Sequence, residues 1–205
     1  MGWTSYHKAD SVSVKDALLA ELKWTNRPEN ERPEIVASAT GSNCMAFAIK
    51  VPGTWIDHNP EDYSMFERAV DGSITTATLF LYRFNKSDYY NFSYKGMDES
   101  VGPYEGVSPK ILKYLSPIKD IERAAYAVQW RKRCEAFKES SKRKRSIKAG
   151  VKVRLAEPLS FGGVKLQEFT AETYYSRGKE KIGFRGSNGV LCRLMARHLE
   201  NATIA

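Results

Sequence analysis

The amino-acid sequence predicts an α+β fold: an antiparallel sheet with packed helices, a long basic helix, and a small C-terminal SH3-like β-barrel. Three observations predict it. Residues 34–95 hold four strand-like segments that end in turns. Residues 120–144 carry apolar side chains at helical spacing, and beyond Gly150 short strands alternate with glycine-rich turns. We therefore expect a main domain over residues 1–145 and a barrel domain over residues 150–205.

The first predicted elements are a helix and a strand hairpin. Ser13 is a favourable N-cap, so a helix should run from Val14 to about Trp24. Residues 34–40 and 44–51 are apolar and separated by a short polar turn. This pattern predicts two strands that pair with each other.

The next strand pair is aromatic. Residues 74–84 are rich in β-branched and aromatic side chains, and a polar turn leads from them to a second strand, residues 89–95. Tyr90, Phe92 and Tyr94 share one face of that second strand. Exposed rings beside cations can stack on the bases of a single-stranded nucleic acid. The alternative is that these rings belong to the core, because one face of an antiparallel pair is normally buried.

A short helix should follow over residues 108–116, with Ser as N-cap and Pro at the first helical position. From Asp120 a long helix is expected to continue to about Lys144. Apolar side chains recur along it at spacings of three and four as far as Phe137, so one side can pack against a core. The stretch beyond is expected to be solvated.

The C-terminal pattern changes to short strands. Residues 151–155 alternate strictly between apolar and basic, as a half-buried strand does. Residues 164–175 form a longer β pattern, and residues 181–184 and 190–192 form shorter ones between glycines. Several short strands in so few residues favour a small SH3-like barrel.

The cysteine content and the apolar runs limit the class of protein. The three cysteines are far apart, without a CxxC or Cys/His cluster, which favours reduced thiols over a disulfide framework or zinc site. The N-terminus lacks the apolar core of a signal peptide, and the longest apolar runs are far shorter than the roughly 20 residues that cross a bilayer. We expect a cytoplasmic protein without membrane association and without a cofactor.

The positive charge is concentrated in one segment. Residues 131–154 hold 11 Lys and Arg against 2 Glu, whereas residues 1–130 hold 14 basic and 17 acidic side chains. Such a segment can contact phosphates and release counterions; the alternative is a solvated helix face that serves solubility. The candidate contacts for nucleic acid or a partner protein are Arg131, Lys132, Lys138, Lys142, Arg143, Lys144, Arg145 and Lys148.

Catalytic motifs are weak in this sequence. A metal-dependent nuclease needs two or three carboxylates around one ion. The residues that come nearest to this are His7, Asp57, His58, Glu61, Asp62, Asp98 and Glu99. They show no recognised ligand spacing, and the sequence has no GxSxG, P-loop or GxGxxG motif. We therefore predict no metal site and lean against an enzyme.

Four stretches together resemble a known family: MGWTSYH at residues 1–7, DYYNFSYKGMDESVGPYE at 88–105, WRKRCEAF at 130–137 and GVKVRLAEPLSF at 150–161. It is an uncharacterised domain-of-unknown-function family whose members open with MGWT and occur in phages, plasmids and conjugative elements. The resemblance implies no activity. It implies a context, since small proteins of mobile DNA in a bacterial host often handle nucleic acid or blunt a defence system.

Three functional hypotheses remain at this point. The first is an accessory protein of a phage or other mobile element that binds nucleic acid or a nucleoprotein through the basic helix and linker. The second is an anti-defence, anti-CRISPR-type inhibitor that binds a host effector protein. The third is a metal-dependent nuclease. Affinity for naked nucleic acid that falls steeply with salt would favour the first. The sequence leaves open the oligomeric state and the choice between DNA and RNA.

Overall fold

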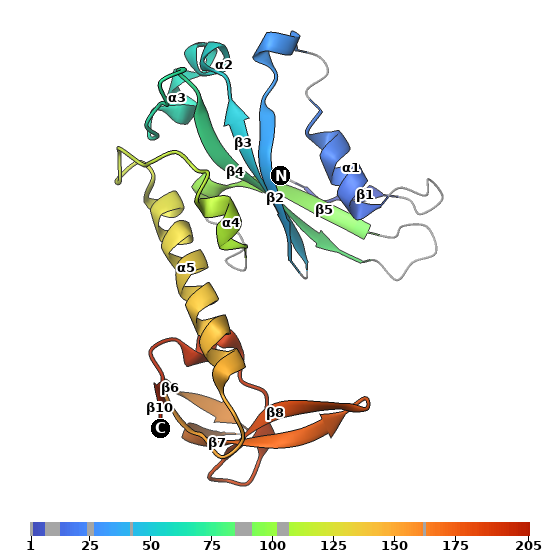
Figure 1. The fold of residues 1–205 in the computed structure, drawn as a ribbon, viewed down its shortest axis with the longest axis vertical. Coiled ribbons are helices and arrows are strands. Elements are labelled where there is room, and N and C mark those ends of the chain that lie inside the picture. The colour runs from blue at the N-terminus through green and yellow to red at the C-terminus, as the bar shows by residue number, and fades with distance from the viewer. Residues whose placement is uncertain are drawn as a thin grey trace. The chain divides into compact units, whose positions relative to one another are not determined.

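The computed structural model describes residues 2–6, 13–23, 27–41, 43–84, 92–101, 107–161 and 163–205. The chain divides into two compact units, Met1–Cys134 (unit 1) and Glu135–Ala205 (unit 2). Each unit has its own antiparallel five-stranded sheet (Figure 1). The expected α+β class is thus confirmed. The division falls within the long helix, earlier than the boundary expected between residues 145 and 150.

The sheet of unit 1 contains the four strands expected from the sequence and one more. Its strands are β1 (Thr4–Tyr6), β2 (Glu34–Thr40), β3 (Cys44–Val51), β4 (Ile74–Arg83) and β5 (Phe92–Asp98). Their order is β1-β5-β4-β3-β2, and all pairs are antiparallel. The expected start of β5 at residue 89 lies outside the described residues.

Short helices join these strands. They are α1 (Val14–Glu21), α2 (Gly53–His58), α3 (Pro60–Tyr63), α4 (Pro109–Leu112) and the 3-10 helices η2 (Glu29–Glu31) and η3 (Glu99–Val101). The Ser13 hydroxyl accepts a hydrogen bond from the Asp16 backbone N–H at 3.1 Å, which is the predicted cap of α1. Ser108 caps α4 in the same way through the Lys110 N–H.

The interior strand β3, between β4 and β2, explains why unit 1 is layered on both faces of its sheet. Phe47 and its alternate neighbours join a cluster that includes Leu18 of α1. Ala46 and Ala48 point to the opposite face and join a cluster that includes Ile111 of α4 and Trp130. Strand β3 is therefore apolar at almost every position, because neither of its faces meets solvent.

Helix α5 (Ala125–Ser146) is the longest helix among the described residues. It begins after a series of turns that follows Asp120 and ends two residues beyond Lys144. Ala127, Trp130 and Cys134 are buried in unit 1. In the part of the helix that belongs to unit 2, Ser140 is buried, and Ile147 is buried just after the helix ends. Burial along α5 therefore does not stop at Phe137, where the expected apolar pattern ends.

The sheet of unit 2 is open. Its strands are β6 (Lys152–Phe161), β7 (Val164–Ser176), β8 (Lys179–Gly186), β9 (Leu191–Cys192) and β10 (Thr203–Ile204), in the order β10-β6-β7-β8-β9. A 3-10 helix, η4 (Ala196–Leu199), precedes β10. No pairing joins the two edge strands in the described part of the chain. The expected SH3-like barrel is therefore not closed, and each edge strand is only two residues long.

One face of this sheet carries the core of unit 2. Val153 lies opposite Phe169 and Ala171 lies opposite Phe184, and these side chains form one cluster with Leu194 and Leu199. Strand β6 breaks register between Arg154 and Leu159. The other face of the sheet carries polar and basic side chains.

Candidate functional site

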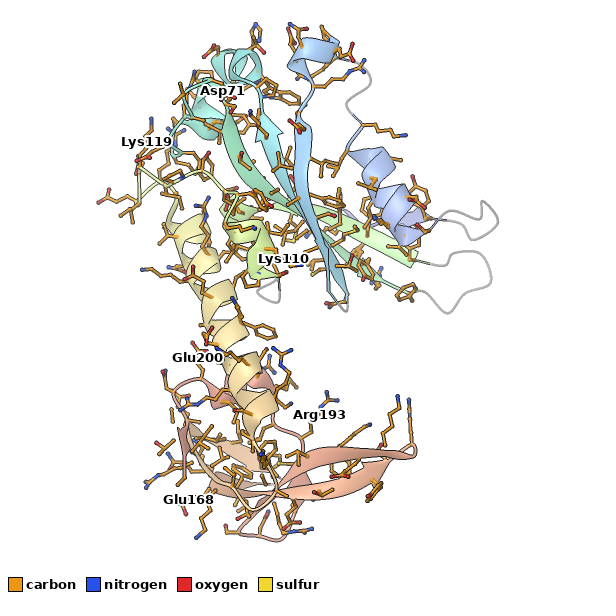
Figure 2. The ribbon with its side chains drawn as sticks, in the orientation of Figure 1. Asp71, Lys110, Lys119, Glu168, Arg193 and Glu200 are labelled. Atoms are coloured by element: carbon orange, nitrogen blue, oxygen red, sulfur yellow. The ribbon has the colours of Figure 1, made fainter. Side chains whose placement is uncertain are left out.

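The excess positive charge of the chain belongs to unit 2. Residues 135–205 hold 15 Lys and Arg against 7 Glu, whereas residues 1–134 hold 17 basic and 17 acidic side chains. Unit 2 therefore carries the whole formal charge of +8. Exposed cations such as Arg193 project from its surface (Figure 2). A cation that already has a partner within the protein is not available to a ligand. The surroundings of each candidate cation therefore decide whether it can bind one.

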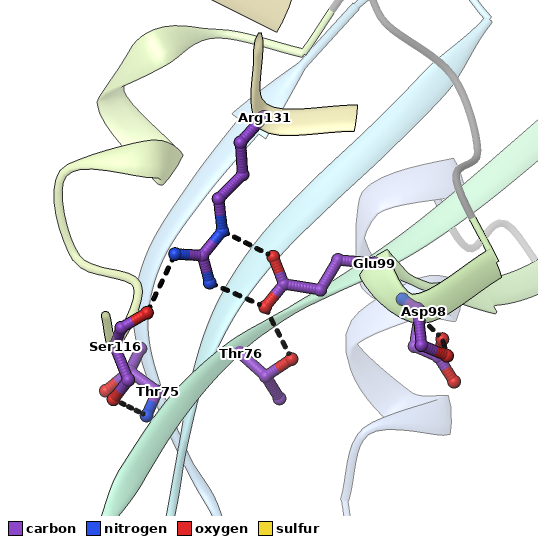
Figure 3. A network of polar contacts seen from close by, with 7 residues as sticks. Thr75, Thr76, Asp98, Glu99, Ser116 and Arg131 are labelled. Atoms are coloured by element: carbon purple, nitrogen blue, oxygen red, sulfur yellow. Dashed lines mark hydrogen bonds and ion pairs between the residues drawn. The ribbon is translucent and has the colours of Figure 1, made fainter. Parts of the chain in front are cut away.

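Arg131 is held in an internal ion pair (Figure 3). Its Nε donates to Glu99 Oε2 and its Nη2 donates to Glu99 Oε1, each at 3.0 Å. Its Nη1 donates to the carbonyl oxygen of Ser116 at 2.7 Å. The Glu99 side chain is 1% exposed and that of Arg131 is 18% exposed. Thr76 Oγ1 donates to the same carboxylate at 2.9 Å.

This arrangement gives Arg131 a structural role. Removing one partner of a buried ion pair leaves an uncompensated charge, so the guanidinium is needed where it lies. It connects α5 to the 3-10 helix η3 that follows β5, and through Ser116 to the segment after α4. Arg131 therefore does not belong to the candidate interface.

Lys144 is the second candidate with an internal partner. Its Nζ donates a hydrogen bond to the carbonyl oxygen of Leu194, a residue of the unit 2 core. Burial lowers the pKa of Lys144, and the nearby positive charge of Arg193 lowers it further. The aliphatic part of a lysine can cover apolar surface while the ammonium group finds a polar partner. Lys144 thus anchors the helix to unit 2.

The remaining basic candidates are exposed. They are Lys132, Lys138, Lys142, Arg143, Arg145 and Lys148. Lys138, Lys142 and Arg145 are four and three residues apart, so they share one face of α5 and span about 10 Å of its axis. Among the described residues, no carboxylate lies within ion-pair distance of these three side chains. We call these three residues the cationic stripe.

The aromatic candidates of β5 lie in the core. Phe92 is 3% exposed and Tyr94 is 5% exposed. The Phe92 ring stacks on Tyr6 of β1 with centroids 5.4 Å apart, and Tyr94 meets Phe80 edge-on. Both rings belong to the same core cluster as Ala17 and Leu18 of α1, so this face of the sheet is covered, and burial raises the pKa of Tyr94. These two rings do not form an exposed stacking surface; Tyr90 lies outside the described residues.

The acidic candidates do not come together as a metal site. Asp57 pairs with Arg68 at 2.7 Å, and Asp98 accepts from the Ser100 backbone N–H at 3.0 Å. Glu99 is occupied by Arg131. In the ranges that the structure describes, no three His, Cys, Asp or Glu side chains are grouped as metal ligands. His7 lies outside those ranges.

A basic cavity on the outer face of the unit 2 sheet was not anticipated as a site. It has a volume of about 490 Å³. Lys152, Thr170 and Arg185 lie in one row across β6, β7 and β8, and Arg154 pairs with Glu168 in the next row. The strict alternation of residues 151–155 indicates part of this site from the sequence, since it places Lys152 and Arg154 on the face of the strand opposite the core. Arg185 comes from a distant strand and so could not be predicted as part of this site. Its Nε donates to both carboxylate oxygens of Glu172 at 2.8 Å, so it has an internal partner, as Arg154 has.

Comparison with known proteins adds one finding. Residues 122–197 match a family described as "Domain of unknown function (DUF6927)". The matched range covers α5 and unit 2 as far as η4, and so includes the basic side chains described above. A domain-of-unknown-function family is thus supported for this part of the chain. Searches of curated proteins and of solved structures gave no match. No helix in the described ranges is both long and apolar enough to cross a membrane.

Proposed function

We propose that the protein binds nucleic acid through the exposed cations of helix α5 and the residues after it. The observation that carries this proposal is the cationic stripe of Lys138, Lys142 and Arg145. These side chains are exposed, share one helix face and have no carboxylate partner among the described residues. Phosphates can therefore take the place of their counterions, and counterion release then supplies the affinity.

The positive charge of unit 2 around the cationic stripe also supports a nucleic acid as the partner. Unit 2 carries all of the net charge, so its electrostatic field attracts a polyanion from a distance. Arg143 and Lys148 add further exposed cations beside the stripe. Contacts of this kind fix the position of the protein on the phosphate backbone and do not read bases. The proposed activity is therefore binding with little sequence preference, by an accessory protein of a phage or other mobile element.

The proposal is tested by binding the full-length protein to labelled single- and double-stranded DNA and RNA across a salt series. The decisive variant replaces Lys142, Arg143 and Arg145 with Ser and keeps Lys144, because Lys144 anchors the helix. We expect the affinity of the wild-type protein for duplex DNA to fall steeply between about 50 and 200 mM salt. The variant should bind more weakly, with a log–log salt slope smaller by about 2 to 3.

A matched control separates a local site from overall charge. Lys15, Lys110 and Lys119 are exposed lysines of unit 1, and the last two are labelled in Figure 2. Their replacement with Ser changes the net charge by the same amount and should leave the salt slope unchanged. An equal loss in both variants would contradict a site on α5. No binding by the wild-type protein at low salt would overturn the proposal and direct the search to an acidic surface on a partner protein.

A further inference from the structure

The hairpin of β7 and β8 extends past the core of unit 2. The last core residues on it are Ala171 and Phe184, and Ile182 packs against the edge of the core. From Thr173 to Ile182 no residue is buried. Figure 1 shows the turn of this hairpin at its free end, away from β6 and β10. We call residues 173–182 the basic hairpin.

The basic hairpin is fixed by its turn and by its base. Ser176 pairs with Lys179, so the loop has two residues, Arg177 and Gly178. Both have positive φ, 54° and 71°, as in the turn type whose twist matches the strands of a hairpin. At the base, Gly183 leaves room for Tyr174, because a Cβ there would lie 3.1 Å from the Tyr174 ring. A preformed ribbon loses little conformational entropy when it binds.

The chemistry of the basic hairpin is that of a ligand for an anionic groove. Arg177, Lys179 and Lys181 are all exposed, and Glu180 is the single acidic residue in this range. None of the three cations has an ion-pair partner among the described residues. Tyr175 is 75% exposed. The hairpin thus offers cations and one apolar surface at the end of a narrow ribbon.

We propose that the basic hairpin enters the major groove of B-form duplex DNA. The proposal rests on the proposed function for the class of partner and adds the form of nucleic acid and the element that enters it. Paired strands lie about 4.8 Å apart, and a two-stranded ribbon fits the major groove, which is about 12 Å wide and about 8.5 Å deep. The four residues of each strand beyond the core reach about 13 Å, enough to approach the groove floor.

The same dimensions argue against duplex RNA. The major groove of A-form RNA is deep and too narrow for protein side chains to read. In B-form DNA, Arg177, Lys179 and Lys181 would lie near the phosphates that line the groove and the acceptors at its floor. Tyr175 would lie beside thymine methyl groups, the apolar feature of that groove. The hairpin therefore distinguishes B-form DNA from duplex RNA.

The test compares two DNA duplexes of one sequence, one unmodified and one with glucosylated hydroxymethylcytosine, whose sugars fill the major groove and leave the phosphates unchanged. The hairpin variant of the full-length protein carries Arg177→Asn, Lys179→Thr and Lys181→Thr. Asn tolerates the positive φ of the turn and Thr favours strands, so the fold should be kept. Circular dichroism and hydrogen exchange of residues 164–186 verify that it is.

We expect the wild-type protein to bind the glucosylated duplex, and duplex RNA, about tenfold or more weakly than unmodified DNA. The hairpin variant should bind all three alike. The Lys142, Arg143 and Arg145 variant should be weaker on every duplex but should still discriminate among them. Equal wild-type affinity for the two DNA duplexes, with salt-dependent binding intact, would overturn the hairpin proposal alone. No binding to any nucleic acid would overturn both proposals.

Discussion

Arg131 and Lys144 lie in the most basic stretch of the chain, yet each satisfies a polar group within its own unit. Arg131 is paired with a buried carboxylate, and Lys144 donates to a core carbonyl oxygen. A side chain that is committed in this way contributes to folding, and its loss acts on stability before it acts on binding. The distinction decides which substitutions report on function.

The buried ion pair of Glu99 and Arg131 should be energetically coupled. Replacement of Glu99 or of Arg131 with Ala should each lower the free energy of unfolding of unit 1 by about 3–5 kcal/mol. The double variant should cost much less than the sum, because neither charge is then left alone. Urea unfolding followed by tryptophan fluorescence measures this, since Trp3, Trp24, Trp55 and Trp130 all belong to residues 1–134. Additive effects would show that the pair is not coupled.

The sequence shows which residues are basic, but it does not show which of them have a partner within the folded protein. Arg131 and Glu99 are 32 residues apart, and Lys144 and Leu194 are 50 apart. Local patterns cannot show such partners, because they depend on how distant segments are packed. The aromatic strand is a similar case. Phe92 and Tyr94 share one face as predicted from alternation, but it is the packing of the distant helix α1 on this face that buries it.

At the scale of elements, Gly186 is the most constrained glycine of unit 2 among the described residues. A Cβ at this position would lie 2.6 Å from Leu166 Cδ1, and Leu166 is 5% exposed. The Gly186→Ala variant should therefore force a shift in the core and cost about 1–3 kcal/mol. Hydrogen exchange of β7 and β8 in the full-length protein measures the loss. Gly2→Ala, where the structure leaves open space, is the control; equal protection in both variants would contradict the close contact.

Strands and helices were predictable where local signals set them. Ser13 predicted the start of α1, and apolar or alternating patterns predicted β2, β3, β4 and β6. Strand β1 was not predicted, because a strand of three residues is too short to show an alternating pattern. Whether the barrel closes could not be predicted from the sequence either, because closure depends on whether two short edge strands pair with each other. In the described residues, β9 and β10 form the two open edges.

At the scale of the whole molecule, the two units differ in charge. Unit 1 is neutral overall, and hydrogen bonds from Lys50 and Ser73 lower the pKa of its Asp71 carboxyl. Unit 2 holds all of the net positive charge and contains His198. A mild fall in pH adds positive charge to unit 2, where it is least favourable.

His198 should make unit 2 less stable in mild acid. Burial lowers its pKa, with further lowering by Arg197 and Lys144, and its Nδ1 accepts from the Met195 backbone N–H at 3.2 Å. A protonated imidazole cannot accept that bond. The unfolded state thus binds the proton more readily, so stability is complete above the ordinary pKa of about 6.5 and declines as pH falls toward the folded value.

Hydrogen exchange at about pH 7.5 and about pH 5.5, corrected for intrinsic rates, should show that unit 2 loses protection at the lower pH. The control is His198→Asn, whose side-chain oxygen can keep the acceptor for Met195 without titrating. It should abolish the pH dependence. If the variant and the wild-type protein lose protection alike, another group in unit 2 carries the effect, since the positive charge gained at His198 would then be without consequence for the fold.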